Sequence, residues 1–209
     1  MQPPSRKEVE RNTLLCWIGH TDTKAATEKD ETSDGPIRML LRHEHFDRIR
    51  LLCTKNQDTN KIDALKLWLK PYCTEANMDI ITTDVTDPID FVAVYRATLA
   101  CINEICPDSD GRGMTFHVSP GTFVMQSVLL LLARLRYPKT RVVQTRKEQF
   151  ASDGKTVLEV NLPKEIDFAS GRRELPSDQI NDGTEQGQHL EEFAKQVAKT
   201  PLRVLLLGE

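Results

Sequence analysis

Residues 116–133, FHVSPGTFVMQSVLLLLA, hold the pattern that decides the fold. A short apolar run, typical of a buried strand, ends in the small-residue turn SPGT and passes directly into a strongly apolar helix. A strand followed at once by a helix is the repeating unit of α/β proteins. The turn allows two interpretations, because Ser119 or Thr122 can cap the helix, or the turn can bind an anion through its hydroxyls and N–H groups.

The same alternation of strands and helices continues on both sides of this stretch. Strands are predicted at residues 13–18, 49–54, 78–85 and 114–118, and helices at residues 36–46, 60–75, 90–105 and 123–137. Residues 19–35 are polar and indicate a connection. The strands at 141–145 and 157–162 are joined too closely for a parallel crossover, so they predict an antiparallel hairpin. The expected fold is α/β, a Rossmann-like, mostly parallel sheet flanked by helices, with that hairpin at one edge.

Composition restricts the class of protein further. The chain has 209 residues, of which 39% are hydrophobic and 28% charged, and its net charge is −3. These values indicate a globular protein and disfavour one that coats nucleic acid. No apolar run approaches the roughly 18–20 residues of a membrane span, and the N-terminus lacks the apolar segment of a signal peptide. Five cysteines without a CxxC pair favour reduced, structural thiols. We therefore expect a cytoplasmic protein that does not associate with membranes.

Two polar turns lie at the carboxyl ends of predicted strands. One comprises residues 19–22, after the first strand, and the other comprises residues 119–122, after the fourth. In doubly wound sheets, ligands bind outside the carboxyl ends of the strands, where the strand order reverses. Glycine in each turn lets the backbone approach a ligand closely. Taken alone, the turn at residues 119–122 favours the helix-cap interpretation. When both turns are considered together, a helix cap and an anion-binding site are equally well supported.

Three further patterns carry weaker signals. Residues 141–147, which include Gln144 and Arg146, make one strand end basic and polar, and this suits either phosphate contact or a solvated edge. His43 and His45 lack a third ligand at a useful spacing, so no metal site is predicted. No GxGxxG motif is present, which disfavours a dinucleotide-dependent oxidoreductase.

The order of elements, with HFDRIRLLCT at residues 45–54 and FHVSPGTFVMQSVLLLLA, resembles the CARF domains, named for the CRISPR-associated Rossmann fold. The sequel, RVVQTRKEQ and then VLEVNLPKEIDFA, is most similar to the sensor domain of RNA-repair operon regulators, which are sigma-54-dependent activators. The final segment, HLEEFAKQVAKTPLRVLLLGE, is similar to the lead-in of sigma-54 AAA+ domains, where a helix and a strand precede a Walker A loop.

This resemblance implies a domain organisation. Residues 1–12 form a polar leader, 13–166 a CARF-like ligand-sensing domain, 167–187 a linker, and 188–209 the helix and first strand of a truncated AAA+ sigma-54-interaction domain. The chain itself is expected to need no cofactor, whereas the missing ATPase domain would use ATP and Mg²⁺. Sigma-54 RNA polymerase and DNA are the expected partners of the missing C-terminal domains.

The resemblance also implies a function. CARF domains form homodimers that bind cyclic oligoadenylates or related RNA-derived nucleotides. We therefore expect this chain to bind such a nucleotide, or an RNA end with a cyclic phosphate, across a homodimer and so to control the ATPase. The implied ligand-binding residues are Gly19, His20, Thr21, Ser119, Pro120, Gly121, Thr122, Gln144 and Arg146.

Two alternatives stay open. Some relatives cleave their ligand, so Thr21, Ser119 and Thr122 are candidate catalytic residues of a metal-independent ring nuclease, although no general base is evident beside them. The other alternative is a Rossmann-like protein-interaction domain that binds no nucleotide. Pro120 and the polar insert at residues 22–35 depart from the family pattern.

Overall fold

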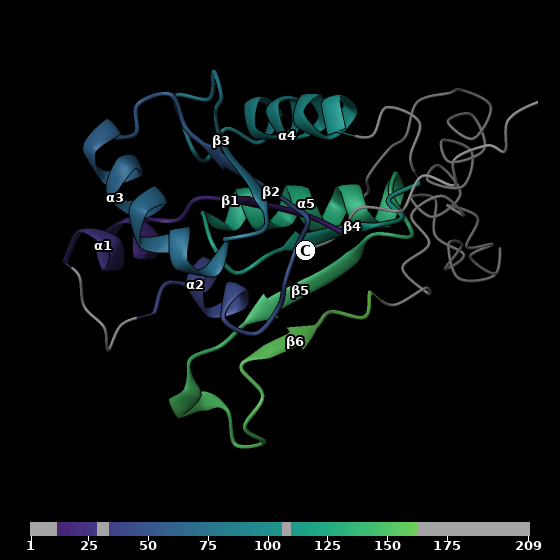
Figure 1. The fold of residues 1–209 in the computed structure, drawn as a ribbon. Coiled ribbons are helices and arrows are strands. Elements are labelled where there is room, and N and C mark those ends of the chain that lie inside the picture. The colour runs from purple at the N-terminus through teal and green to yellow at the C-terminus, as the bar shows by residue number, and fades with distance from the viewer. Residues whose placement is uncertain (1–11, 29–33, 106–109, 163–209) are drawn as a thin grey trace, which may run out of the picture. The chain divides into compact units, whose positions relative to one another are not determined.

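The computed structural model describes residues 12–28, 34–105 and 110–162 (Figure 1). These residues contain a six-stranded sheet with the strand order β3-β2-β1-β4-β5-β6. The strands are β1 (Thr13–Trp17), β2 (Arg48–Cys53), β3 (Asn77–Thr82), β4 (Met114–His117), β5 (Arg141–Thr145) and β6 (Val157–Glu159). The predicted leader apart from Asn12, the linker at 167–187 and the AAA+ lead-in at 188–209 lie outside the described residues.

The sheet is parallel except at one edge. β1 pairs with β2 and β4, β2 with β3, and β4 with β5, all in parallel, whereas β5 and β6 are antiparallel. This confirms the predicted α/β fold with an antiparallel edge hairpin. β2 and β3 lie on one side of β1, and the chain then crosses to β4 on the other side. The strand order therefore reverses between β1 and β4, which is where such sheets bind ligands.

Helices cover both faces of the sheet (Figure 1). They are α1 (His20–Glu28), α2 (Pro36–Leu41), α3 (Thr59–Leu69), α4 (Phe91–Ile105) and α5 (Phe123–Leu135), with short 3₁₀ helices η1 (Lys70–Tyr72) and η2 (Glu148–Phe150). Successive side chains of β1 point to opposite faces, so Leu15 and Trp17 pack under α4 and α5, whereas Leu14 and Cys16 pack under α1, α2 and α3. Burial on both faces explains why β1 is entirely apolar apart from Thr13.

Helix α1 was not predicted, because residues 19–35 were expected to be a polar connection. Its sequence, HTDTKAATE, offers only alanines and short polar side chains for burial. Asp22, Thr23, Ala25 and Ala26 face inward, and none of these gives the spacing of large apolar residues that marks an amphipathic helix. The short side chains let α1 pack closely on the sheet without such a pattern.

Two predicted helices end earlier than expected. The helix predicted to reach residue 46 ends at Leu41, since Glu44 beyond it pairs with Arg141 and Phe46 enters the core. The helix predicted over residues 60–75 ends at Leu69 and tightens into η1, which contains Pro71. Within the described residues, no helix combines the length and apolar character that crossing a membrane requires.

Candidate functional site

The two predicted turns contact each other at the reversal of strand order. Gly19 follows β1 by two residues, and Gly121 lies between β4 and α5. A Cβ atom added to Gly19 would stand 2.7 Å from the backbone nitrogen of Gly121 and 3.5 Å from the Cα of Pro120. Only glycine at position 19 permits this approach of the two backbones. The sequence therefore predicted correctly that these turns share one edge of the sheet.

Gly121 is required by its conformation as well as by its neighbours. Its φ angle of 86° lies in the left-handed region that side chains other than glycine rarely adopt. A Cβ atom there would stand 2.9 Å from the sulfur of Met125 and 3.2 Å from the Cβ of Trp17. The turn thus keeps its backbone directly against the end of β1.

Thr122 caps helix α5. Its hydroxyl oxygen accepts a hydrogen bond from the Met125 N–H at 3.3 Å, and the hydroxyl donates to the carbonyl of Pro88 at 2.8 Å. The second bond ties the start of α5 to the segment that precedes α4. The cap predicted for this turn is therefore present at Thr122, and both hydrogen-bonding functions of the hydroxyl are in use.

Ser119 fastens the same turn to strand β5. Its hydroxyl oxygen accepts the Thr145 N–H at 2.6 Å, and the hydroxyl donates to the Thr145 carbonyl at 3.1 Å. Gln126 of α5 donates its amide to the Ser119 carbonyl at 3.1 Å. Pro120 is buried beside this contact. The Ser119 side chain thus serves to position the turn.

His20 and Thr21 form the start of α1 and are exposed at the edge where the turns meet. The expected loop at residues 19–22 is thus replaced from His20 onward by the first turn of a helix. The first N–H groups of a helix lack intrahelical partners and favour an anion, so this position retains the chemistry predicted for the loop. Of the three hydroxyls considered for catalysis, that of Thr21 is the exposed one.

Gln144 and Arg146 lie on the hairpin side of the site. Gln144 is exposed on β5 opposite Leu158 of β6. Arg146 donates to the Lys155 carbonyl at 2.9 Å and pairs with the carboxylate of Asp153, so its guanidinium closes the hairpin. The basic and polar residues predicted to form one strand end therefore do not form one group. Gln144 and Arg146 lie at the carboxyl end of β5, whereas Arg141 lies at its start and interacts with other segments.

Arg141 stands at that opposite end of β5. Its guanidinium binds both carboxylate oxygens of Glu44, at 2.6 and 2.7 Å, and this bidentate pair joins the segment after α2 to the sheet. His43, one of the two histidines considered for metal binding, has its Nε2 3.1 Å from the Thr156 hydroxyl. No cluster of three potential metal ligands occurs among residues 12–28, 34–105 and 110–162.

Two buried polar groups near the turns were not singled out from the sequence. Asp22 on α1 is fully buried, and burial raises the pKa of its carboxyl to about 7. His117 on β4 is fully buried as well, and burial lowers the pKa of its imidazole to about 3. Its Nε2 lies 3.1 Å from the Thr145 hydroxyl, and its Nδ1 has no hydrogen-bond partner in the described part of the chain. Position in an apolar strand was the available signal for His117, whereas Asp22 lay in a stretch read as a polar connection and gave no signal of burial.

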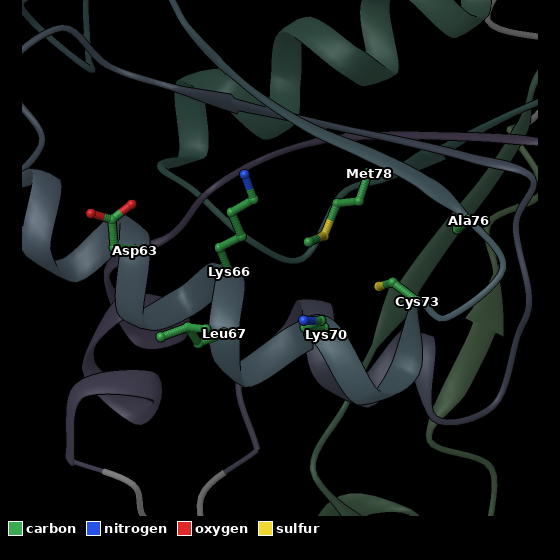
Figure 2. A pocket seen from close by; sticks show the side chains of 7 residues that line it. All are labelled: Asp63, Lys66, Leu67, Lys70, Cys73, Ala76 and Met78. Carbon is green, nitrogen blue, oxygen red and sulfur yellow. The ribbon is translucent and has the colours of Figure 1, made fainter.

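A separate cavity of about 460 Å³ lies between α3 and the edge strand β3 (Figure 2). Figure 2 shows the Met78 side chain between this helix and the strand, with Lys66 extending from α3. None of the predicted site residues lines this cavity, so it is distinct from the paired turns. Its lining residues are Asp63, Lys66, Leu67, Lys70, Cys73, Ala76 and Met78.

A family model described as the regulator of RNA terminal phosphate cyclase, RtcR, matches residues 11–175, a span that includes both turns and the whole sheet. The chain belongs to this family. The match agrees with the resemblance to RNA-repair regulators inferred from the strand and helix motifs. No curated protein matches the chain.

Among solved structures, the chain is similar to Enterococcus italicus Csm6 bound to cyclic hexa-2'-fluoro-hexa-dAMP. The TM-score is 0.54 at 17% sequence identity, and the match covers 90% of this chain and 53% of the Csm6 chain. The chain thus spans about half the length of that protein. At this identity the likeness establishes a shared fold, which is the Rossmann-like CARF fold expected from the sequence.

Proposed function

We propose that this chain is the ligand-sensing domain of a sigma-54-dependent transcriptional activator of the RtcR family. It binds an RNA-derived nucleotide, either a cyclic oligoadenylate or an RNA end with a cyclic phosphate, across a homodimer. Binding controls an AAA+ ATPase domain in the cytoplasm. The observation that carries this proposal is the contact between Gly19 and the turn at Gly121, where the strand order reverses.

The paired turns suit a phosphodiester. The starts of α1 and α5 converge on them, and each helix start presents partial positive charge from its first N–H groups. Glycine at positions 19 and 121 lets the two turns pack together at close range. The exposed hydroxyl of Thr21 and the exposed imidazole of His20 add hydrogen-bonding groups that suit a ribose or a phosphate oxygen.

An apolar surface beside the turns supports binding across a dimer. Ile89, Phe91, Val92 and Phe123 are exposed by 67%, 43%, 53% and 80%. The bond from Thr122 to the Pro88 carbonyl holds the start of α5 beside the segment that contains Ile89. Adjacent exposed apolar side chains of this kind mark interaction surfaces. A second copy of the chain that covers them would bring its own pair of turns close to the first.

Isothermal titration calorimetry tests the binding proposal. The ligands are cyclic tetraadenylate, cyclic hexaadenylate and a short RNA that ends in a 2′,3′-cyclic phosphate. With protein at about 100 µM, binding with a Kd near 10 µM gives a clear heat signal. We expect heat from at least one ligand, and the responding ligand identifies the class. The same RNA with a 3′-hydroxyl end is the matched control. Absence of heat from all three ligands contradicts the proposal.

A further inference from the structure

Asp22 lies where the two turns meet the start of α2. Its Oδ2 accepts the Gly19 N–H at 3.3 Å, and its Oδ1 accepts the Ile37 N–H at 2.8 Å. A Cβ atom on Gly19 would stand 3.0 Å from Oδ2, and one on Gly35 would stand 2.6 Å from Oδ1. Both glycines therefore make room for this carboxyl. Asp22 thus fixes Gly19, and through Gly19 the contact with Gly121.

The charged groups around Asp22 do not neutralise it. On α1, Lys24 pairs with Glu28 on the exposed face, and His20 is exposed. The β4–α5 turn contains no ionisable residue, and Cys16 on β1 is a thiol whose pKa is raised by burial and, to a smaller extent, by the Asp22 charge. Around α2, Asp34 pairs with Arg38 and Arg42. On α3, the ionisable side chains of this region are exposed, namely Lys61, Asp63 and Lys66.

We propose that binding of a phosphodiester at the paired turns is coupled to the uptake of one proton by Asp22. This inference rests on the function proposed above and adds how the site accepts a negative charge. The proton comes from solvent and forms an O–H bond on Oδ2, the oxygen with the longer hydrogen bond. The carboxyl becomes neutral, and no other covalent bond changes.

The geometry gives this proton one effect. It removes the repulsion between the ligand phosphate and a carboxylate that no cation neutralises, in a buried, low-dielectric setting. Burial holds the pKa of Asp22 at about 7 in the free protein, so the uptake occurs near neutral pH at small cost.

The proposed proton uptake determines whether affinity rises or falls with pH. A nearby phosphate disfavours the carboxylate, so the pKa of Asp22 is higher in the complex than in the free protein. Affinity therefore falls as the pH rises above about 7, by up to about tenfold per pH unit when one proton is taken up. Both RNA with a cyclic phosphate and cyclic oligoadenylates are phosphodiesters, which lack the ionisation near pH 6 of a phosphate monoester. The ligand itself therefore contributes no slope.

Calorimetry of the full 209-residue chain with the ligand that responds, between about pH 6 and pH 9, measures this slope. Repeating each titration in buffers of different ionisation enthalpy counts the protons taken up. The variant Asp22→Asn keeps the side-chain volume and an acceptor for the Ile37 N–H but cannot titrate, so its affinity is expected to be independent of pH. Asp63→Asn, which alters an exposed carboxyl on α3, is expected to keep the wild-type slope.

Three results decide the proposal. Wild-type binding without proton uptake above pH 7 overturns the role of Asp22 and leaves the proposed function intact. The same conclusion follows if Asp22→Asn retains the wild-type dependence of affinity on pH. If Asp22→Asn fails to fold, the proton count on the wild-type chain decides. The variant His20→Gln removes the other titratable side chain of this turn, and loss of the slope above pH 7 in that variant would also overturn the role of Asp22. Absence of binding by every ligand refutes the proposed function itself.

Discussion

Gly121 and Gly154 have similar backbones and different surroundings. Their φ angles are 86° and 70°, but a Cβ atom would meet Met125 and Trp17 at Gly121 and nothing within 4 Å at Gly154. We expect Gly121→Ala and Gly154→Ala each to lose about 1–2 kcal/mol of stability from backbone strain. Only Gly121→Ala should also weaken ligand binding, because the added Cβ crowds Met125 and Trp17 and shifts the turn that contacts Gly19. Denaturant unfolding and calorimetry measure both effects. Equal ligand affinity in the two variants would contradict the role of the turn.

His117 should make the protein sensitive to acid. Its folded pKa of about 3 lies below the usual value of 6.5, so the stability it contributes is present above pH 6.5 and is lost as the pH falls towards 3. His117→Gln retains a polar group for Thr145 but does not titrate. Between those pH values, wild-type stability should fall by about 1.4 kcal/mol per pH unit more than that of the variant.

Urea unfolding at several pH values measures this difference. The raised pKa of Asp22 acts in the opposite direction, since its contribution decreases as the pH rises from 3.8 to about 7. That contribution is the same in wild type and His117→Gln, so it cancels when the two proteins are compared. Parallel pH profiles would show that His117 is not the responsible group.

Residue identity predicted where the turns lie but not what their side chains contact. The strand-end positions of Gly19 and Gly121 followed from the alternation of strands and helices. The partners of Ser119 and Thr122 are Thr145 and Pro88, which are 26 and 34 residues away in sequence. Local sequence holds no information about such partners, because the sheet order brings them together. The burial of Asp22 was hidden for the same reason.

At the scale of elements, prediction succeeded where large apolar side chains supplied a period. Helices α4 and α5 carry such residues along a buried face, and their predicted and observed ranges nearly coincide. Helix α1 buries Ala25, Ala26 and short polar groups, and it was missed. Tertiary packing stabilises such a helix although its own pattern is weak. The sequence therefore predicted the sheet and most of its helices, but not the helix that begins at the candidate site.

The cap of α5 links two helices, so its loss should weaken both. Thr122→Ala removes the bonds to the Met125 N–H and to the Pro88 carbonyl, and we expect a loss of about 1–2 kcal/mol in the free energy of unfolding. Thr122→Ser keeps the hydroxyl and should lose much less. Chemical denaturation compares the variants, and hydrogen exchange reports opening of the first turn of α5. If serine were as destabilising as alanine, the methyl group rather than the hydroxyl would be responsible.

For the whole molecule, ligand binding and dimerisation must be linked if the ligand spans two copies. A ligand that contacts both copies binds the dimer more tightly than the monomer, so it strengthens the dimer by the same factor. The apolar surface of Ile89, Phe91, Val92 and Phe123 adjoins the turns. Disrupting that surface should therefore weaken ligand binding, although none of its four side chains belongs to the paired turns. The nearest link between the surface and a turn is Thr122, which directly precedes Phe123.

Phe123→Glu tests this linkage. Phe123 is 80% exposed on α5, so a charge there should leave the fold intact and prevent burial against a second copy. Sedimentation velocity should show a dimer for the wild type, a larger dimer fraction with ligand, and a monomer for the variant. Its ligand affinity should fall at least tenfold, which corresponds to about 1.4 kcal/mol. Leu67→Glu, at a residue 71% exposed on α3, is the matched control and should remain dimeric. A monomeric wild type that binds ligand at full affinity would refute a site shared between two copies, because nothing would then couple the surface to the turns.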